Sequence, residues 1–265
     1  MPTISSLPRL VKTDPVGKFA GLPFPRIGSG SVDKFLGNLE VLRGGRHAAR
    51  AASHGQSPLP REFTGGTNAP TTRYGRAATR GVAYLGDLGG LFRQLGIPDA
   101  LLLGNSLGGV NAYQFAARHP ERVRGLVVED IGAVLADDTS FTLPWAGVFP
   151  SREALAERVG PRFLPYLEDA FRQTAAGWRL AFDPHDMLAS QAQLNGDHWA
   201  DWLATACPAL LVHGRESRVT TTAMVEEMAA RRPNTRLVTL DGGHVVHLDN
   251  PAGFAAAVRS FLQEL

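Results

Sequence analysis

Ser106 has the sequence context of a catalytic nucleophile. It is the central residue of GNSLG (residues 104–108), which matches the pattern G-x-S-x-G. The apolar run 100–105 predicts a buried strand, and the helical pattern 107–119 ends before Pro120. At such a strand-to-helix turn a serine hydroxyl is exposed beside free helix N–H groups, which can stabilise an oxyanion. The alternative is an ordinary glycine-rich turn in which Ser106 only caps the helix.

His244 has the sequence context of the general base that a serine hydroxyl needs at neutral pH. It lies in DGGHVVHLDNPAGF (residues 241–254), where a strand pattern ends, a glycine-rich turn follows and a helical pattern begins. His247 completes an H-x-x-H spacing that could hold a metal, but no carboxylate-rich motif accompanies it, so we expect it to pack or bond locally. His213, in ALLVHG, is expected to be a core or strand-end histidine.

Strand and helix patterns alternate from Tyr84 to the end of the chain. Apolar runs typical of buried strands occupy residues 100–105, 125–130, 209–214 and 235–240. Helical patterns occupy residues 84–96, 107–119, 221–232 and 251–265. This alternation predicts an α/β fold with a doubly wound, mostly parallel sheet and right-handed crossovers.

Residues 133–205 interrupt the alternation and contain all four tryptophans. Helical patterns at residues 151–159, 165–178 and 197–204 predict an inserted helical lid. The alternative is a packed helical subdomain that does not contact substrate. We therefore divide the chain into an atypical N-terminal part (1–83), a core with the nucleophile turn (84–132), the lid (133–205) and a C-terminal core with His244 (206–265).

Charge and composition favour a cytoplasmic enzyme or binding protein. Residues 1–85 carry twelve Lys or Arg against four Asp or Glu, a net +8, and the remainder carries −6. The arginines are scattered among Ala and Gly with little aromatic interleaving, so we expect solvated charge and no nucleic-acid or membrane partner. No apolar run reaches the roughly 20 residues of a membrane span, and the first residues lack a signal-peptide core. The single cysteine, Cys207, excludes an internal disulfide and is expected to be a structural thiol.

Four segments together resemble the α/β-hydrolase superfamily. They are LLLGNSLGG, RHPERVRGLVVED, CPALLVHG and GGHVVHLDNP, in the order and rough spacing of that family. The resemblance covers about two thirds of the chain. It implies a serine hydrolase with Ser106 as nucleophile and His244 as base, acting on a small-molecule ester without a cofactor. Oligomeric state is left open.

The resemblance offers two positions for the acid of the triad. Many family members place it after the strand matched by LLVHG, where this chain has Ser217 and, one residue earlier, Glu216. Others place it at the end of the strand that reads LVVEDIGA, which offers Glu129 and Asp130. The segment EDIG resembles the D-I-A-P of small bacterial esterases, which also share the G-H-x-x-H-x-x-x-P ending. We therefore expect Asp130, with Glu216 and then Glu129 as alternatives.

The N-terminal part matches the family least. The oxyanion hole is expected to use the backbone N–H of Leu107 and a second donor at Ser29, and SHGQSPLP (residues 53–60) also resembles a family loop. No clear strand pattern appears within residues 1–83. Either this part has diverged, or some of it is an altered reading of an ordinary family sequence, such as a shifted frame.

The expected activity is hydrolysis of a carboxylic ester through an acyl-enzyme. A C–C bond hydrolase or lactonase of the same fold is an alternative, because the same triad serves these reactions and GNSLGG also resembles C–C bond hydrolases. A second alternative is a catalytically impaired protein that binds a ligand beneath the lid.

Overall fold

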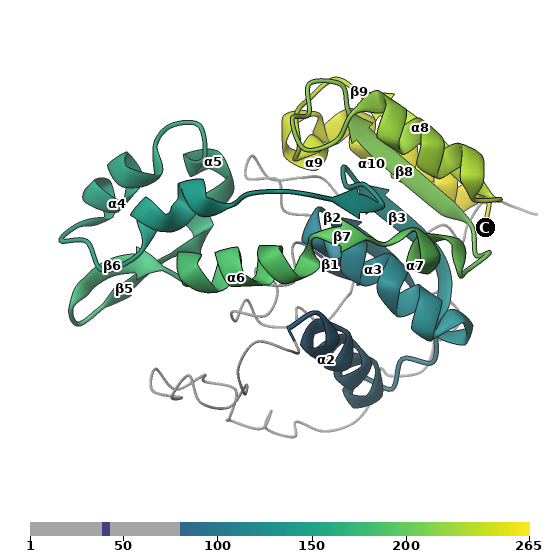
Figure 1. The fold of residues 1–265 in the computed structure, drawn as a ribbon, viewed down its shortest axis with the longest axis horizontal. Helices are drawn as coiled ribbons and strands as arrows, with labels where there is room; N and C mark the ends of the chain where they lie inside the picture. Colours follow the sequence, from purple (N-terminus) through teal and green to yellow (C-terminus); the bar gives the residue numbers. More distant parts are fainter. Residues whose placement is uncertain (1–38, 43–79) are drawn as a thin grey trace, which may run out of the picture.

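The computed structural model describes the backbone of Leu39–Leu42 and of residues 80–83, and residues 84–265 in full (Figure 1). Ser29 and residues 53–60 therefore lie outside the described residues. Within the described part of the chain, no helix combines the length and apolar character needed to cross a membrane.

A five-stranded sheet forms the centre of the fold, in the order β1-β2-β3-β8-β9. Its strands are β1 (Leu39–Leu42), β2 (Ala100–Asn105), β3 (Val123–Glu129), β8 (Ala209–Gly214) and β9 (Thr235–Leu240). β1 pairs antiparallel with β2, and all other pairs are parallel. This confirms the expected mostly parallel sheet. The expectation of no strand within residues 1–83 is wrong at β1, because four residues are too few to give a periodic signal.

Helices cover both faces of the sheet (Figure 1). The main ones are α2 (Arg80–Gln94), α3 (Leu107–Arg118), α8 (Thr222–Arg231) and α10 (Pro251–Gln263). Alternate strand residues point to opposite faces, so Leu126 and Val128 of β3 join a core with α2 and α3, while Val127 packs with α10. The central strands β2, β3 and β8 therefore carry apolar residues on both faces, as the sequence pattern requires.

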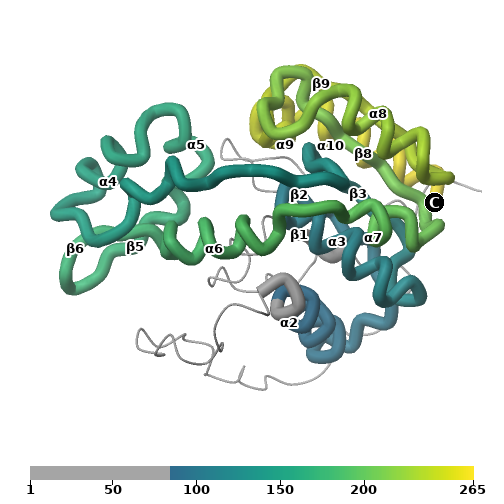
Figure 2. Tube along the Cα trace, in the orientation of Figure 1, coloured from purple at the N-terminus to yellow at the C-terminus, as the bar shows by residue number. Residues whose placement is uncertain are grey.

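The chain between β3 and β8 leaves the sheet and returns to it through α6 (Figure 2). Its helices are η2 (Ser140–Trp145), α4 (Arg152–Val159), α5 (Leu164–Leu167), η3 (Glu168–Ala170), α6 (Pro184–Leu194) and α7 (Trp199–Leu203). Its strands are β4 (Val134–Leu135), β5 (Phe171–Thr174), β6 (Gly177–Leu180) and β7 (Gly196–Asp197). A separate apolar cluster that includes Trp145, Leu155 and Phe171 holds the distal part together.

The predicted helix over residues 165–178 is wrong beyond Ala170. There the chain forms an antiparallel hairpin of β5 and β6, with Phe171 opposite Leu180 and both side chains buried. Gly177 adopts a φ of 131°, which favours glycine, and the Thr174 hydroxyl donates to the Gly177 carbonyl oxygen at 2.9 Å. Tertiary burial and turn chemistry thus override the local helical pattern.

Candidate active site

Ser106 lies at a strained turn between β2 and α3. Its φ of 54° and ψ of −124° lie in a region that non-glycine residues rarely adopt. A Cβ on Gly104 would lie 2.2 Å from the backbone carbon of Gly108, so the turn can close only with glycine there. The Ser106 N–H donates to the carbonyl oxygen of Glu129 at 3.0 Å, which ties the turn to the end of β3.

Asp130 immediately follows β3 and is fully buried. Five donors surround its carboxylate: Ser217 Oγ and His244 Nδ1 (2.8 Å) at Oδ2, and Thr220 Oγ1 (2.7 Å), His213 Nδ1 (3.0 Å) and Gly214 N (3.1 Å) at Oδ1. Burial alone would raise the pKa of Asp130, but hydrogen bonds from His244, Ser217 and Thr220 hold it below its usual value. The carboxylate is therefore ionised at neutral pH and only accepts hydrogen bonds.

His244 lies between Asp130 and the nucleophile turn. Its Nδ1 must carry the proton, because the ionised Asp130 carboxylate cannot donate one. The Asn105 side chain donates to the His244 carbonyl oxygen at 3.0 Å, so the residue before Ser106 holds the histidine loop against the turn. Among the described residues no hydrogen bond joins Ser106 to His244, and such contacts are often long before substrate binds.

The two alternative acids do not contact His244. The Glu129 carboxylate is buried and bonds His247 Nδ1 at 2.8 Å, and Glu216 is exposed. His247 is therefore hydrogen-bonded, but its partner lies 118 residues away in the sequence. Within the part of the chain that the structure describes, no group of His, Cys, Asp and Glu residues has the arrangement of a metal site.

Ser217 and His213 contact the acid, a role that their local sequence did not reveal. Ser217 occupies the position where many family members carry the acid, and here its hydroxyl donates to Asp130. His213 is buried, as expected, but its ring also bonds Asp130. The order of the strands explains these contacts, because β3 and β8 are parallel neighbours and their carboxyl ends lie side by side. The Asp130 N–H, for example, donates to the Val212 carbonyl oxygen at 2.8 Å.

Asp137 is a further carboxylate near His244. The Asn195 side chain holds its backbone, accepting from the Asp137 N–H at 3.1 Å and donating to its carbonyl oxygen at 2.8 Å. Burial raises the pKa of Asp137, while the charge of His244 acts to lower it. The Asp137 carboxylate is thus within electrostatic reach of the imidazole.

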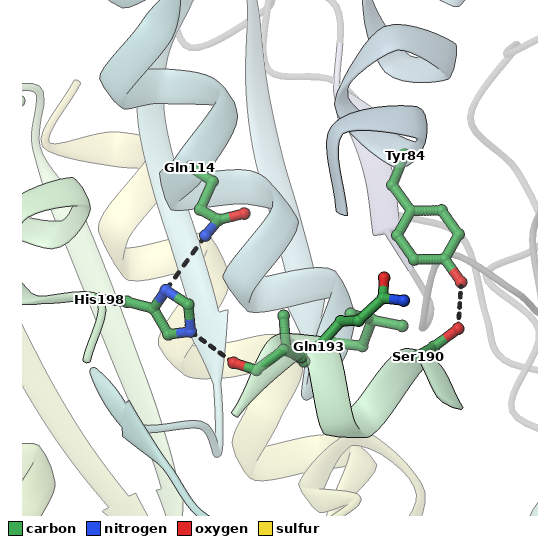
Figure 3. A pocket seen from close by; sticks show the side chains of 7 residues that line it. Tyr84, Gln114, Ser190, Gln193 and His198 are labelled. Carbon is green, nitrogen blue, oxygen red and sulfur yellow. Dashed lines mark hydrogen bonds between the residues drawn. The ribbon is translucent and has the colours of Figure 1, made fainter. Parts of the chain in front are cut away.

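A small pocket of about 60 Å³ borders Leu107, the first residue of α3. Its lining residues are Tyr84, Leu107, Gln114, Ser190, Gln193, Leu194 and His198. In Figure 3, Gln114 bonds His198 at 3.2 Å and Tyr84 bonds Ser190 at 3.3 Å.

The first N–H groups of a helix have no partner within it, so the Leu107 N–H is available as an oxyanion donor.

Comparisons with known proteins identify the family of the chain. The model of the Alpha/beta hydrolase family matches residues 28–257. The chain is 31% identical over 191 residues to 2-hydroxymuconate semialdehyde hydrolase of Pseudomonas sp. strain CF600, with 66% of each chain covered. It is 27% identical over 215 residues to pimeloyl-[acyl-carrier protein] methyl ester esterase of Yersinia enterocolitica, covering 72% of this chain and 80% of that one.

Solved structures show the same fold. The crystal structure of E-2-(acetamidomethylene)succinate hydrolase aligns with a TM-score of 0.63 at 22% identity, covering 72% of this chain and 76% of that one. A marine microorganism esterase aligns with a TM-score of 0.59 at 22% identity, covering 70% and 78%.

Proposed function

Because the chain belongs to the alpha/beta hydrolase family, we propose that this enzyme is a serine hydrolase that cleaves a small carboxylic ester through an acyl-enzyme. The observation that carries the proposal is the hydrogen bond from His244 Nδ1 to the buried Asp130 carboxylate, at a loop bonded to the residue before Ser106. This bond fixes the imidazole tautomer that can accept a proton from serine.

Each step of the proposed reaction uses a group already described. His244 Nε2 takes the Ser106 proton while Oγ bonds the ester carbonyl carbon, and the oxyanion receives the Leu107 N–H. The carbon–oxygen bond of the ester then breaks, and His244 returns the proton to the departing alkoxide. Water repeats these steps on the acyl-enzyme and releases the acid. Asp130 stabilises the imidazolium throughout.

Cleavage of a C–C bond is the second candidate, because the relative at 31% identity is named a semialdehyde hydrolase. The esterase relative is less identical but is matched over a larger share of both chains. Both reactions would use Ser106 and His244, so only the substrates that the protein turns over can distinguish the two candidates.

A substrate survey tests the proposal. Purified protein is assayed on p-nitrophenyl esters of graded acyl length and on a vinylogous 1,5-diketone, the general substrate type of C–C bond hydrolases. We expect ester turnover that disappears in Ser106→Ala. Diketone cleavage without ester turnover would support the second candidate. Ester turnover that persists in Ser106→Ala, or no turnover of any substrate, would contradict the proposal.

A further inference from the structure

Beyond the three residues of the proposed triad, we infer that Glu129 and His247 form a buried pair that positions His244 for catalysis. Glu129 is the last residue of β3 and Asp130 follows it, and each bonds one histidine of the segment after β9: Asp130 bonds His244, and Glu129 bonds His247. The inference rests on the proposed function, and it assigns the pair a positioning role.

The contact between Glu129 and His247 is built from three hydrogen bonds. The His247 backbone N–H donates to Oε1 at 2.8 Å, and ring Nδ1 lies 3.0 Å from Oε1 and 2.8 Å from Oε2. The Glu129 side chain has no exposed surface, and the His247 side chain is 18% exposed. The imidazole also lies close to the Phe254 ring, at 5.8 Å between centroids. Both the backbone and the ring of His247 are therefore fixed.

Glu129 also contacts the nucleophile turn. Its carbonyl oxygen accepts the Ser106 N–H at 3.0 Å and the Asn105 side chain at 3.4 Å. One residue thus holds Ser106 through its backbone and the histidine segment through its side chain. Movement of either partner changes the distance that the proton must travel between Ser106 and His244.

The loop between β9 and α9 (Val246–Asp249) carries His244. At its start the Glu216 N–H donates to the Gly242 carbonyl oxygen at 2.9 Å, and exposed Arg215 pairs with exposed Asp241 at 3.0 Å. The Gly243 N–H donates to Asp249 at 2.8 Å, but that carboxylate belongs to the same segment and is exposed. Asn105 and Asp130 bond His244 itself. The helix that follows is attached by Val246, which is buried in an apolar cluster, and by the buried polar pair of Glu129 and His247, three residues from His244.

Removing the ring donor should slow chemistry without weakening substrate binding. In His247→Leu the loop keeps its backbone N–H bond but loses the ring bonds, so we expect kcat to fall by about 10- to 100-fold with KM within about twofold. His247→Asn restores an N–H donor near the position of Nδ1 and should recover most of the loss. Glu129→Gln keeps an acceptor for the backbone N–H and should give an intermediate rate.

His185 provides a matched control. Its backbone N–H and its Nδ1 both bond the Asp183 carboxylate, at 2.9 and 3.0 Å, but its side chain is 68% exposed at the start of α6. His185→Leu should therefore leave kcat and KM unchanged. Circular dichroism checks that each variant is folded, and His247→Asn and Glu129→Gln decide the matter if His247→Leu does not fold.

Two readouts distinguish failure of this inference from failure of the proposed function. The first is the rate at which a fluorophosphonate labels Ser106, and the second is the NMR signal of the His244 Nδ1 proton. Wild-type protein that is not labelled overturns the proposed function, and the NMR signal still tests the positioning role. We expect that signal to be sharp in wild type and His247→Asn and broadened by exchange in His247→Leu. A sharp signal and wild-type labelling in folded His247→Leu would overturn the inference.

Discussion

Replacing Asp130 by asparagine separates its catalytic contribution from its structural one. The amide nitrogen must take the place of one carboxylate oxygen and cannot accept hydrogen bonds. At Oδ1 it would face three donors, and at Oδ2 it would face two, His244 and Ser217. It therefore occupies the Oδ2 position, where the Ser217 hydroxyl can rotate to accept. His244 is then left with an N–H facing another N–H.

The imidazole relieves this conflict by moving its proton to Nε2, where it blocks acceptance of the Ser106 proton. A triad with the wrong tautomer loses about 10⁴-fold in kcat. The three hydrogen bonds at Oδ1 remain, but their acceptor is no longer charged, so each stabilises the folded protein by roughly 1 kcal/mol less. A neutral amide is less costly to bury than a carboxylate, which offsets part of this loss. We expect the free energy of unfolding to fall by only about 1–3 kcal/mol.

The assay compares Asp130→Asn with Glu216→Gln on the ester that wild type turns over fastest, with stability from urea unfolding. Because Glu216 is exposed and does not contact His244, Glu216→Gln should keep wild-type kcat and stability. Near-wild-type kcat in Asp130→Asn, or a large loss in Glu216→Gln alone, would refute the assignment of the acid.

Three further predictions concern the turn, the pH dependence and the inserted segment. Gly104→Ala should abolish activity and lower the free energy of unfolding by about 1–3 kcal/mol or more, because its Cβ would overlap the Gly108 backbone. Gly86→Ala, where α2 has open space for a Cβ, should raise the free energy of unfolding by about 0.5–1 kcal/mol. Thermal unfolding compares the two variants. Asp137→Asn should raise Tm at neutral pH and leave Tm unchanged below about pH 3. Burial raises the folded pKa of the Asp137 carboxyl above its unfolded value of 3.8, so the contribution of this group to folding stability is lost as pH rises through the folded pKa. Equal Tm shifts at both pH values would contradict this. Tyr166→Phe removes the hydroxyl that donates to Asp249 at 3.2 Å and should change kcat by less than about threefold, because the bond is exposed; a larger loss would show that α5 supports the His244 loop.

The sequence predicts well where one local pattern decides the structure. The strands 100–105 and 209–214 agree with β2 and β8, which are largely apolar and mostly buried, and the strand 235–240 agrees with β9, which is mostly half-buried. The nucleophile turn is equally local, since Gly104 and Ser106 lie within one pentapeptide. These features depend on neighbours in the chain.

Features that depend on distant residues could not be predicted in the same way. The hairpin of β5 and β6 forms because Phe171 finds an apolar cluster, which its own helical pattern does not indicate. The contacts of His213 and Ser217 with Asp130 require β3 and β8 to be neighbours. Glu129 was an alternative acid by position alone, and only the tertiary structure pairs it with His247.

Mass mapping of a covalent adduct tests the central claim most directly. Folded protein is treated with a fluorophosphonate, digested, and each modified peptide is sequenced by mass spectrometry. The account predicts one adduct per chain, on the Ser106 hydroxyl, that is absent in Ser106→Ala and formed far more slowly in His244→Ala. An adduct on another residue, or no adduct on folded protein, would contradict it.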